Sequence, residues 1–423
     1  MMLSLQIPGL IRLQFRRACL RVPYSATTTA VRGCKMTTFT RVELDHPSRS
    51  CLLKHDDGNL IGTYPYVWLR DNCRCDKCFH PSSRGRLVLM ANLDPDIIPE
   101  GAEVGDQTLN IRWPDDHRSQ FPLSWLKEMQ FSDMSEDPVS TPVRQLWGNE
   151  MQHKIHTFSF ADVLNNDKSL HDWIEALQVH GLALIKNAPH KEGAVLEIGK
   201  RISFLKTTTY GEIFQVFAKF EANNLAYTNA ELGLHTDLPY NAYPPNIQLL
   251  HCIKQVHSKG GENQFCDGYK VAEDLQHIDP EVFRILTTIP VDFRDCGKEY
   301  NVYHMKHRSP IIQLLPDGRY KAISYNDQVR APYIQIPVQD VYKIYRAIKM
   351  FNTELYKEEN KFEIKLIEGD IVSFDNQRVL HGRSGFEVTE TSTRFLEGGF
   401  IDWDEACSRM RVIREKILNE EPL

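Results

Sequence analysis

The chain lacks any run of about 18 uninterrupted apolar residues, the shortest that crosses a membrane as a helix. It also lacks a basic excess, because the formal net charge is -6 at pH 7 and the pI is near 6.3. Internal repeats and low-complexity segments are absent as well. We therefore expect no membrane span and no nucleic-acid partner. With 42% apolar and 25% charged residues, the 423-residue chain is typical of a globular protein of about two domains.

Acidic residues are missing from the first 42 positions. The same stretch carries seven basic residues, namely Arg12, Arg16, Arg17, Arg21, Arg32, Lys35 and Arg41. This composition is typical of a mitochondrial transit peptide, and a disordered basic tail is the alternative. We expect residues 1–36 to be such a segment. The protein would then be mitochondrial, or cytoplasmic if translation starts at Met36.

A secretory signal is also missing, so the ten cysteines do not indicate a disulfide framework. Three of them, Cys73, Cys75 and Cys78, are crowded into six positions. In a chain of this length, such crowding favours metal binding in a reducing compartment.

A fourth ligand for this cluster is expected from a hairpin. Residues 109–113 alternate between apolar and polar types, Pro114-Asp115-Asp116 form a turn, and His117 opens the return strand. Three thiolates and one imidazole make the closed tetrahedral set of a structural zinc site. His80 is nearer in sequence, but it precedes a proline in an expected loop, so we favour His117.

Apolar spacing divides the chain into a small first domain and a larger second one. We expect a zinc-binding domain over residues 40–145, an irregular linker over residues 145–156 and a second domain over residues 157–423. Helical periodicity predicts helices over 169–179, 194–205, 338–356 and 403–418, and one that starts near Tyr269. Strands are predicted over 182–185, 247–253, 362–366 and 371–374.

The second domain carries a His-x-Asp motif, His235-Thr236-Asp237. Side chains alternate along a strand, so this His and Asp on one strand would reach the same ion. His381, expected just beyond a strand, offers a third ligand, and Arg394 can bind a carboxylate through two parallel hydrogen bonds. Two imidazoles and a carboxylate on one side of a metal form the facial site of non-haem Fe(II) oxygenases. The tripeptide alone is common in surface turns, and the order of His, Asp, His and Arg makes it informative.

This order resembles the Fe(II)- and 2-oxoglutarate-dependent dioxygenases. The resemblance implies an α+β, mainly β protein whose catalytic domain is a double-stranded β-helix, or jelly roll, with the metal in its mouth. It also implies that His235, Asp237 and His381 bind iron and that Arg394 binds 2-oxoglutarate. Dioxygen is the further substrate, and 2-oxoglutarate is converted to succinate.

Aromatic residues lie on both sides of the metal motif. Tyr210, Phe214, Tyr227 and Phe400 can surround a quaternary ammonium group, which donates no hydrogen bond and is recognised by π faces. From composition alone, a packed aromatic core is the simpler interpretation, because 10% of the chain is aromatic.

From Pro65 to Leu418 the chain resembles the gamma-butyrobetaine/trimethyllysine dioxygenase family. The matching stretches are residues 67–73, 113–115, 222–224, 249–255, 374–376, 380–383 and 402–404. The resemblance implies hydroxylation of gamma-butyrobetaine to L-carnitine, with ascorbate as reductant, in a homodimer. It implies that Cys73, Cys75, Cys78 and His117 bind zinc, that Tyr210 and Tyr227 contact the trimethylammonium group, and that Asn224 and Asn326 lie near the substrate carboxylate.

Three positions depart from the family pattern. Phe214 replaces a Trp, Phe400 replaces a Tyr, and Leu238 replaces a Tyr that would help to hold the substrate carboxylate. Phenylalanine keeps a π face, although Trp is the stronger cation partner. Trimethyllysine or another trimethylammonium compound is therefore an alternative substrate. A non-enzymatic zinc-binding scaffold is the alternative from a different class.

Overall fold

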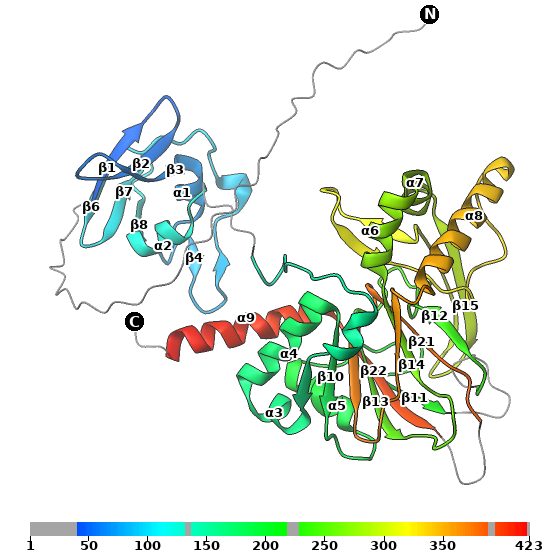
Figure 1. Ribbon diagram of the computed structural model, residues 1–423. Helices are drawn as coiled ribbons and strands as arrows, with labels where there is room; N and C mark the ends of the chain where they lie inside the picture. The colour runs from blue at the N-terminus through cyan, green and yellow to red at the C-terminus, as the bar shows by residue number, and fades with distance from the viewer. Residues whose placement is uncertain (1–39, 132–136, 218–227, 388–393, 421–423) are drawn as a thin grey trace, which may run out of the picture. The chain divides into compact units, whose positions relative to one another are not determined.

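The computed structural model describes residues 40–131, 137–217, 228–387 and 394–420 (Figure 1). Contacts divide the chain into two compact units, residues 1–134 and 135–423. The division lies before the expected boundary at residue 145. Residues 1–36, expected as a transit peptide, lie outside the described part of the chain.

The first unit is built from two antiparallel three-stranded sheets, ordered β1-β2-β3 and β6-β7-β8. Its buried side chains come from both sheets and from two short helices, and they include Leu53, Tyr64, Ile111 and Trp113. The strands and helices are β1 (Thr40–Asp45), β2 (Ser50–His55), β3 (Leu60–Pro65), α1 (Tyr66–Asp71), β4 (Phe79–His80), β5 (Gly85–Arg86), η1 (Met90–Asn92), β6 (Gly101–Gly105), β7 (Thr108–Arg112), β8 (Arg118–Pro122) and α2 (Leu123–Glu128). The hairpin predicted around residues 114–116 is present as β7 and β8.

The second unit contains a six-stranded mixed sheet and a four-stranded antiparallel sheet. The larger sheet has the order β11 (Ile213–Phe217), β22 (Phe395–Ile401), β13 (Ile247–Lys254), β20 (Ile371–Asp375), β10 (Leu182–Lys186), β9 (Thr157–Ser159). The smaller has the order β12 (Leu232–His235), β21 (Val379–Arg383), β14 (Asn263–Asp267), β19 (Lys361–Ile364). Two further ladders pair β15 (Val291–Lys298) with β16 (Val302–Ser309) and β17 (Ile312–Leu314) with β18 (Tyr320–Ile323).

One hydrophobic core joins the two sheets of the second unit. Leu250 and Phe374 from the larger sheet pack in the same cluster as Phe265 and Phe362 from the smaller. Phe265 and Phe374 have ring centroids 5.6 Å apart, in an edge-to-face arrangement that aromatic pairs prefer. The sheets therefore face one another, which is the α+β, mainly β arrangement expected.

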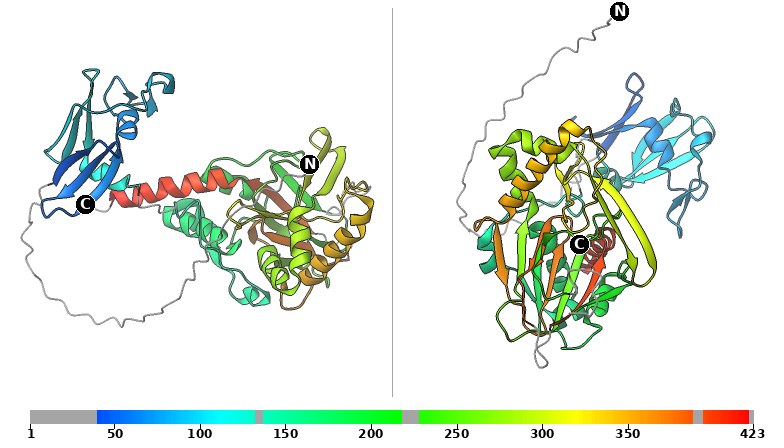
Figure 2. Two further views of the ribbon diagram at one scale, coloured as in Figure 1. Left: turned by 90° about the horizontal axis from the view of Figure 1, so that it is seen from above. Right: turned by 90° about the vertical axis from the view of Figure 1, so that its right-hand side faces the viewer.

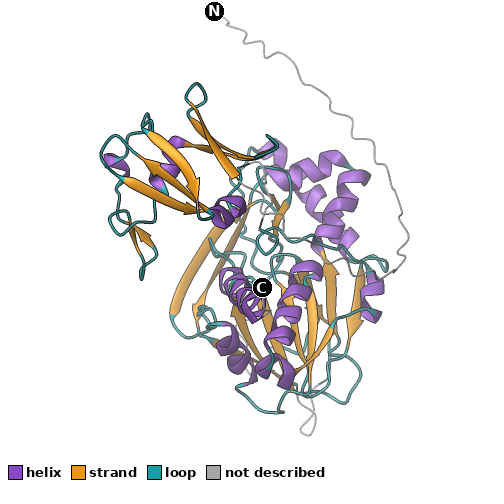
Figure 3. Cartoon of the chain, turned by 90° about the vertical axis from the view of Figure 1, so that its left-hand side faces the viewer, coloured by secondary structure: helices purple, strands orange, loops and turns teal. Residues whose placement is uncertain are grey.

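Helices cover the outer side of the larger sheet (Figures 2 and 3). Trp173, Ile198 and Met410 from three of them bury against Leu249 of β13. Helices of this unit are α3 (Phe160–Asn165), α4 (Asp167–His180), α5 (Ala194–Ile202), α6 (Gly268–Ile278), α7 (Pro280–Thr288), α8 (Val338–Leu355) and α9 (Trp403–Glu420), with the 3-10 helix η2 (Asn149–His153). Among the described helices, none is long and apolar enough to span a membrane.

The helices predicted from periodicity are confirmed as α4, α5, α6, α8 and α9. In α4 the Asn166 side chain accepts the Ser169 N–H at the start, and Gly181 at φ 74° ends the helix, as capping rules require. Helical spacing would put Tyr345 on the apolar face of α8 beside Ile344 and Ile348, yet 48% of its surface is exposed.

The predicted linker over residues 145–156 is instead a packed part of the second unit. Trp147 and Met151 are buried in the core between the sheets. Gln145 N–H donates to Val179 O of α4, and Trp147 Nε1 donates to His180 O. No regular apolar period marks this segment, so its burial depends on tertiary contacts that the pattern does not encode.

Candidate active site and metal centres

The His-x-Asp motif and the distal histidine converge between two neighbouring strands. His235 of β12 lies directly opposite His381 of β21, and the two ring centroids are 4.3 Å apart. Asp237 approaches both, with Oδ1 3.2 Å from His235 Nε2 and Oδ2 3.8 Å from His381 Nε2. One ligand atom from each residue lies within 4.8 Å of the others, so all three can bind one ion.

Two details of the expected geometry are corrected. Strand β12 ends at His235, so Asp237 lies beyond it and reaches the site from a turn. Asn376 holds this turn, since its side chain accepts the Asp237 N–H at 2.6 Å and donates to Asp237 O at 3.0 Å. His381 lies inside the short strand β21, where the sequence pattern placed it just beyond a strand.

The protonation states of Asp237 and His381 and the orientation of the His235 ring suit a divalent metal. Burial works to raise the pKa of Asp237, but the His235 hydrogen bond and the charge of His381 outweigh it and hold the pKa at about 2. Burial and the neighbouring His235 lower the pKa of His381 to about 3. A contact of 2.8 Å between His235 Nδ1 and Gly233 O fixes the ring so that Nε2 faces Asp237. A carboxylate and imidazole nitrogens are therefore available as ligands.

Arg394 is a buried cation immediately before β22. Its side chain is 4% exposed and donates to Asn263 Oδ1 at 3.2 Å, while its Nε has no hydrogen-bond partner. Burial, and next the charge of Arg383, lower the pKa of Arg394 to about 9. No carboxylate forms an ion pair with Arg394 among the residues that the structure describes. Because an unpaired buried charge is costly, this position favours an anionic ligand.

A pocket opens beside His235 and Asp237, and its empty space, together with the open solvent at its mouth, is about 580 Å³. It brings together the predicted residues Tyr210, Phe214, Asn326 and Phe400 with the two metal-binding candidates His235 and Asp237. The predicted Asn224 and Tyr227 lie outside the described residues. Leu238, which stands where the family pattern has a Tyr near the substrate carboxylate, also lines the pocket. The remaining lining residues were not predicted: Val216, Tyr240, Gln328 and Val329.

The aromatic wall of this pocket depends on a glycine. Phe214 of β11 lies opposite Gly398 of β22, and a Cβ on Gly398 would come within 2.3 Å of the Phe214 ring. The bare backbone lets this ring lie against the strand, with its centroid 5.2 Å from that of Phe400.

Leu238, next to the metal-binding candidate Asp237, has a positive φ of 56°, a conformation that non-glycine residues rarely adopt.

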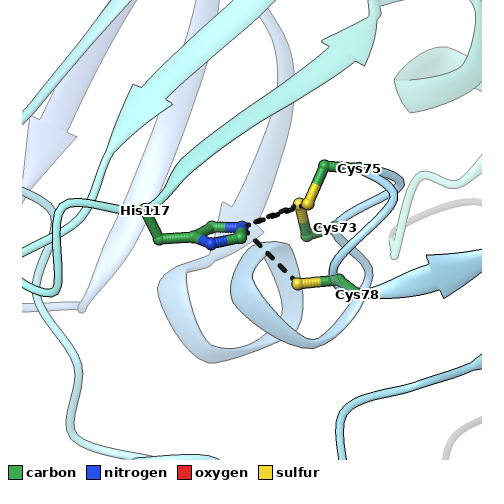
Figure 4. A group of neighbouring side chains, drawn as sticks. All are labelled: Cys73, Cys75, Cys78 and His117. Carbon is green, nitrogen blue, oxygen red and sulfur yellow. Dashed lines mark hydrogen bonds between the residues drawn. The ribbon is translucent and has the colours of Figure 1, made fainter.

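The cysteine cluster in the first unit brings four possible ligands of one metal ion together (Figure 4). His117 Nε2 lies 3.2 Å from Cys73 Sγ and 3.5 Å from the Sγ atoms of Cys75 and Cys78. A tetrahedral ion with ordinary Zn–S and Zn–N bonds would separate such ligands by about 3.6 Å. His80 lies apart from the cluster, and its Nδ1 contacts Ser82 and Ser83.

Known proteins share this combination of units. The model of the taurine catabolism dioxygenase TauD, TfdA family matches residues 140–399, which is more than half of the chain. The chain belongs to this family. The model of the gamma-butyrobetaine hydroxylase-like N-terminal domain matches residues 42–127.

Three named relatives each match 84% of the chain. Gamma-butyrobetaine dioxygenase of Homo sapiens is 38% identical over 84% of this chain and 92% of its own, and that of Pseudomonas sp. (strain AK-1) is 31% identical over 84% and 91%. Mitochondrial trimethyllysine dioxygenase of Homo sapiens is 29% identical over 84% of both chains. The chain is thus an Fe(II)- and 2-oxoglutarate-dependent dioxygenase of the TauD/TfdA family.

Proposed function

We propose that this dioxygenase hydroxylates gamma-butyrobetaine to L-carnitine. The observation that carries the proposal is that three aromatic side chains line the same pocket as two of the metal-binding candidates. The aromatic residues are Tyr210, Phe214 and Phe400, and the metal-binding candidates are His235 and Asp237. Aromatic faces recognise a trimethylammonium group, and a C–H bond of such a substrate would be held beside the metal. The gamma-butyrobetaine dioxygenases that match 84% of the chain support this choice of substrate.

The residues present fit both the iron and the co-substrate. His235, Asp237 and His381 would hold Fe(II) on one side, and the buried Arg394 would bind the far carboxylate of 2-oxoglutarate. Bound iron supplies the redox chemistry that couples dioxygen reduction and 2-oxoglutarate decarboxylation, giving succinate and CO2, to insertion of one oxygen atom into the substrate C–H bond. The chain's own contribution is to fix the ligands through Asn376 and Gly233 and to orient the substrate.

Orientation of the substrate follows from the two kinds of pocket wall. The aromatic side chains favour the cationic end, while Asn326, whose Oδ1 already accepts the Gln328 N–H at 3.0 Å, presents its amide NH2 for a carboxylate. Such two-point binding sets which carbon approaches the metal.

We propose that the catalytic unit is a double-stranded β-helix, that Cys73, Cys75, Cys78 and His117 hold a structural zinc, and that ascorbate acts as reductant. We also propose a homodimer in mitochondria, with residues 1–36 as the targeting segment. Light scattering tests the dimer, and an intact Met1 on the endogenous mitochondrial protein would contradict the targeting proposal.

The decisive experiment measures succinate formed by the full-length protein with Fe(II), ascorbate and 2-oxoglutarate. Gamma-butyrobetaine and trimethyllysine are compared at equal concentration, with a sample without substrate as background. We expect turnover mainly on gamma-butyrobetaine. Turnover on trimethyllysine alone would transfer the proposal to that substrate, because Phe214, Leu238 and Phe400 depart from the butyrobetaine pattern. Turnover on neither would reject both.

A further inference from the structure

A tyrosine and an aspartate lie behind the substrate pocket, on the hairpin of β15 and β16. Tyr303 donates its hydroxyl proton to Asp295 Oδ2 at 3.1 Å. Its ring centroid lies 6.4 Å from that of Tyr210, which lines the pocket in front of it. Tyr240, the other tyrosine of the pocket wall, is 3% exposed. Three phenols and one carboxylate therefore form a layer around one side of the pocket.

The hairpin backbone holds Tyr303 in this position. Gly297 pairs directly with Tyr303 across the ladder, and a Cβ on Gly297 would lie 3.0 Å from the Tyr303 hydroxyl oxygen and 3.2 Å from Cζ. Tyr303 therefore lies flat across the strand at a position that only glycine leaves open. Asp295, two residues before Gly297, is on the same face of the strand and receives the hydroxyl.

The tyrosines are coupled to one another and to the carboxylate. Burial, and then the charge and hydrogen bond of Tyr210, raise the pKa of Tyr303, and the hydrogen bond to Asp295 acts in the same direction. The pKa of Tyr240 is also raised, by burial first and then by Tyr210. Tyr303 and Tyr240 are thus neutral, and each has one proton to donate.

A carboxylate oxygen accepts hydrogen bonds, so Asp295 fixes the direction of the Tyr303 O–H. Tyr303 donates its proton to Asp295, its oxygen is left to accept, and its ring lies beside that of Tyr210 in the pocket wall. The Tyr303 O–H dipole thus has its proton turned toward Asp295. A cation in the pocket is stabilised by this orientation and by the carboxylate behind it.

We propose that Asp295, through Tyr303 and Tyr210, is a positioning residue that makes this pocket select a cationic over an uncharged ligand of the same shape. The inference rests on the proposed function, because it assumes that a trimethylammonium group occupies the aromatic pocket. The hairpin of β15 and β16 would then supply part of the selectivity for a cation. The Phe214 and Phe400 rings do not supply all of it, because they stand where the family pattern has a Trp and a Tyr.

The test compares gamma-butyrobetaine with its carbon isostere, in which a tert-butyl group replaces the trimethylammonium group. Asp295→Asn and Tyr303→Phe are measured on the full-length protein for KM, kcat and direct binding by calorimetry, with Asp317→Asn as a charge-matched control. Asp317 is an exposed turn residue paired with Arg319, so its variant repeats the charge change away from the pocket.

We expect both variants to weaken binding of the cationic ligand about five- to tenfold, with kcat, the KM for 2-oxoglutarate and binding of the isostere unchanged. The double variant should add little, because both changes interrupt the same hydrogen bond. Equal losses for both ligands would show a merely structural role and overturn the inference. Unchanged cation binding in active variants would also overturn it while leaving the proposed function intact, whereas a wild-type protein inactive on every trimethylammonium compound would remove both.

Discussion

At the scale of single residues, the chemistry of the site depends on charges that the protein leaves without a protein partner. Arg394 is the clearest case, since it is buried beside Asn263 and forms no ion pair with a described carboxylate. A protein that buries such a cation loses stability unless an anion binds to it. Binding of the 2-oxoglutarate carboxylate at Arg394, as proposed, would offset this loss of stability.

Replacement of Arg394 by Met should separate stability from co-substrate binding. We expect the KM for 2-oxoglutarate to rise about 30-fold or more, because truncating one partner of a buried charged pair costs roughly 2–5 kcal/mol. The melting temperature without 2-oxoglutarate should be equal or higher, since the buried charge is removed. Arg319→Met, at an exposed position, is the control. An unchanged 2-oxoglutarate KM would remove Arg394 from the site.

Leu238 permits a gain-of-function prediction. It lines the pocket two positions before Tyr240. Leu238→Tyr should lower the KM for gamma-butyrobetaine by about tenfold, because a hydrogen bond to a charged carboxylate contributes roughly 1.5–3 kcal/mol. Leu238→Phe adds the ring without the hydroxyl, so the difference between the two variants measures the hydrogen bond alone. If Tyr and Phe behave alike, the substrate carboxylate does not reach this wall.

The sequence alone located the three metal-binding candidates but only some of the residues that line the pocket. His235, Asp237 and His381 belong to a short motif followed by a histidine at the expected distance, so pattern and order located them. Tyr240 enters the pocket only because the chain turns after Leu238, where φ is 56°. Residue types do not encode that turn, because the conformation is unfavourable for leucine and is imposed by its surroundings.

At the scale of elements, a buried ion pair ties the packed segment before η2 to the sheets. Arg378 donates to both oxygens of Asp267, and both side chains are 0% exposed. Arg378 also donates to Gln145 O and Val179 O, and Asp267 accepts the Trp147 N–H. This network explains why residues that looked like a linker belong to the core.

Asp267→Ala should therefore destabilise the second unit strongly. We expect a loss of about 3–5 kcal/mol in the free energy of unfolding, because the Arg378 guanidinium would remain buried without its counter-ion. Chemical denaturation followed by tryptophan fluorescence measures the loss. Asp172→Ala is the matched control, since its pair with Lys168 on α4 is exposed and should contribute at most about 1 kcal/mol. Similar small losses for both variants would mean that the network relaxes around the vacancy.

Helices could be predicted from the sequence where apolar residues recur at the spacing of a helix face. Helices α4 and α8 have such a period and a clear beginning or end, so the sequence located them. Residues 145–156 have none, although Trp147 and Met151 are buried. Trp147 and Met151 fill gaps between the sheets, and they do not recur at a regular spacing. The sequence therefore predicted the end of the first domain at residue 145, after the division at residue 134 that the contacts show.

At the scale of the whole molecule, the two candidate metal centres belong to separate compact units. The cysteine cluster lies in the first unit and the His-Asp-His site in the second, so the loss of one metal should not remove the other. A structural zinc contributes roughly 10–16 kcal/mol of binding free energy, which is comparable to the entire stability of a small domain. The first unit is then expected to fold only with its metal.

Cys75→Ser tests this separation. We expect the first unit to unfold, with loss of hydrogen-exchange protection over residues 40–131 and loss of bound zinc, because three ligands do not close the tetrahedral site. Protection over β10, β13 and β20 and the binding of Fe(II) should persist, since these strands share their core with the second unit alone. Cys296→Ser, at an exposed position in the second unit, is the control. A Cys75 variant that loses zinc yet keeps its protection would show that the cluster does not stabilise the first unit, while loss of protection in both units would show that they fold as one.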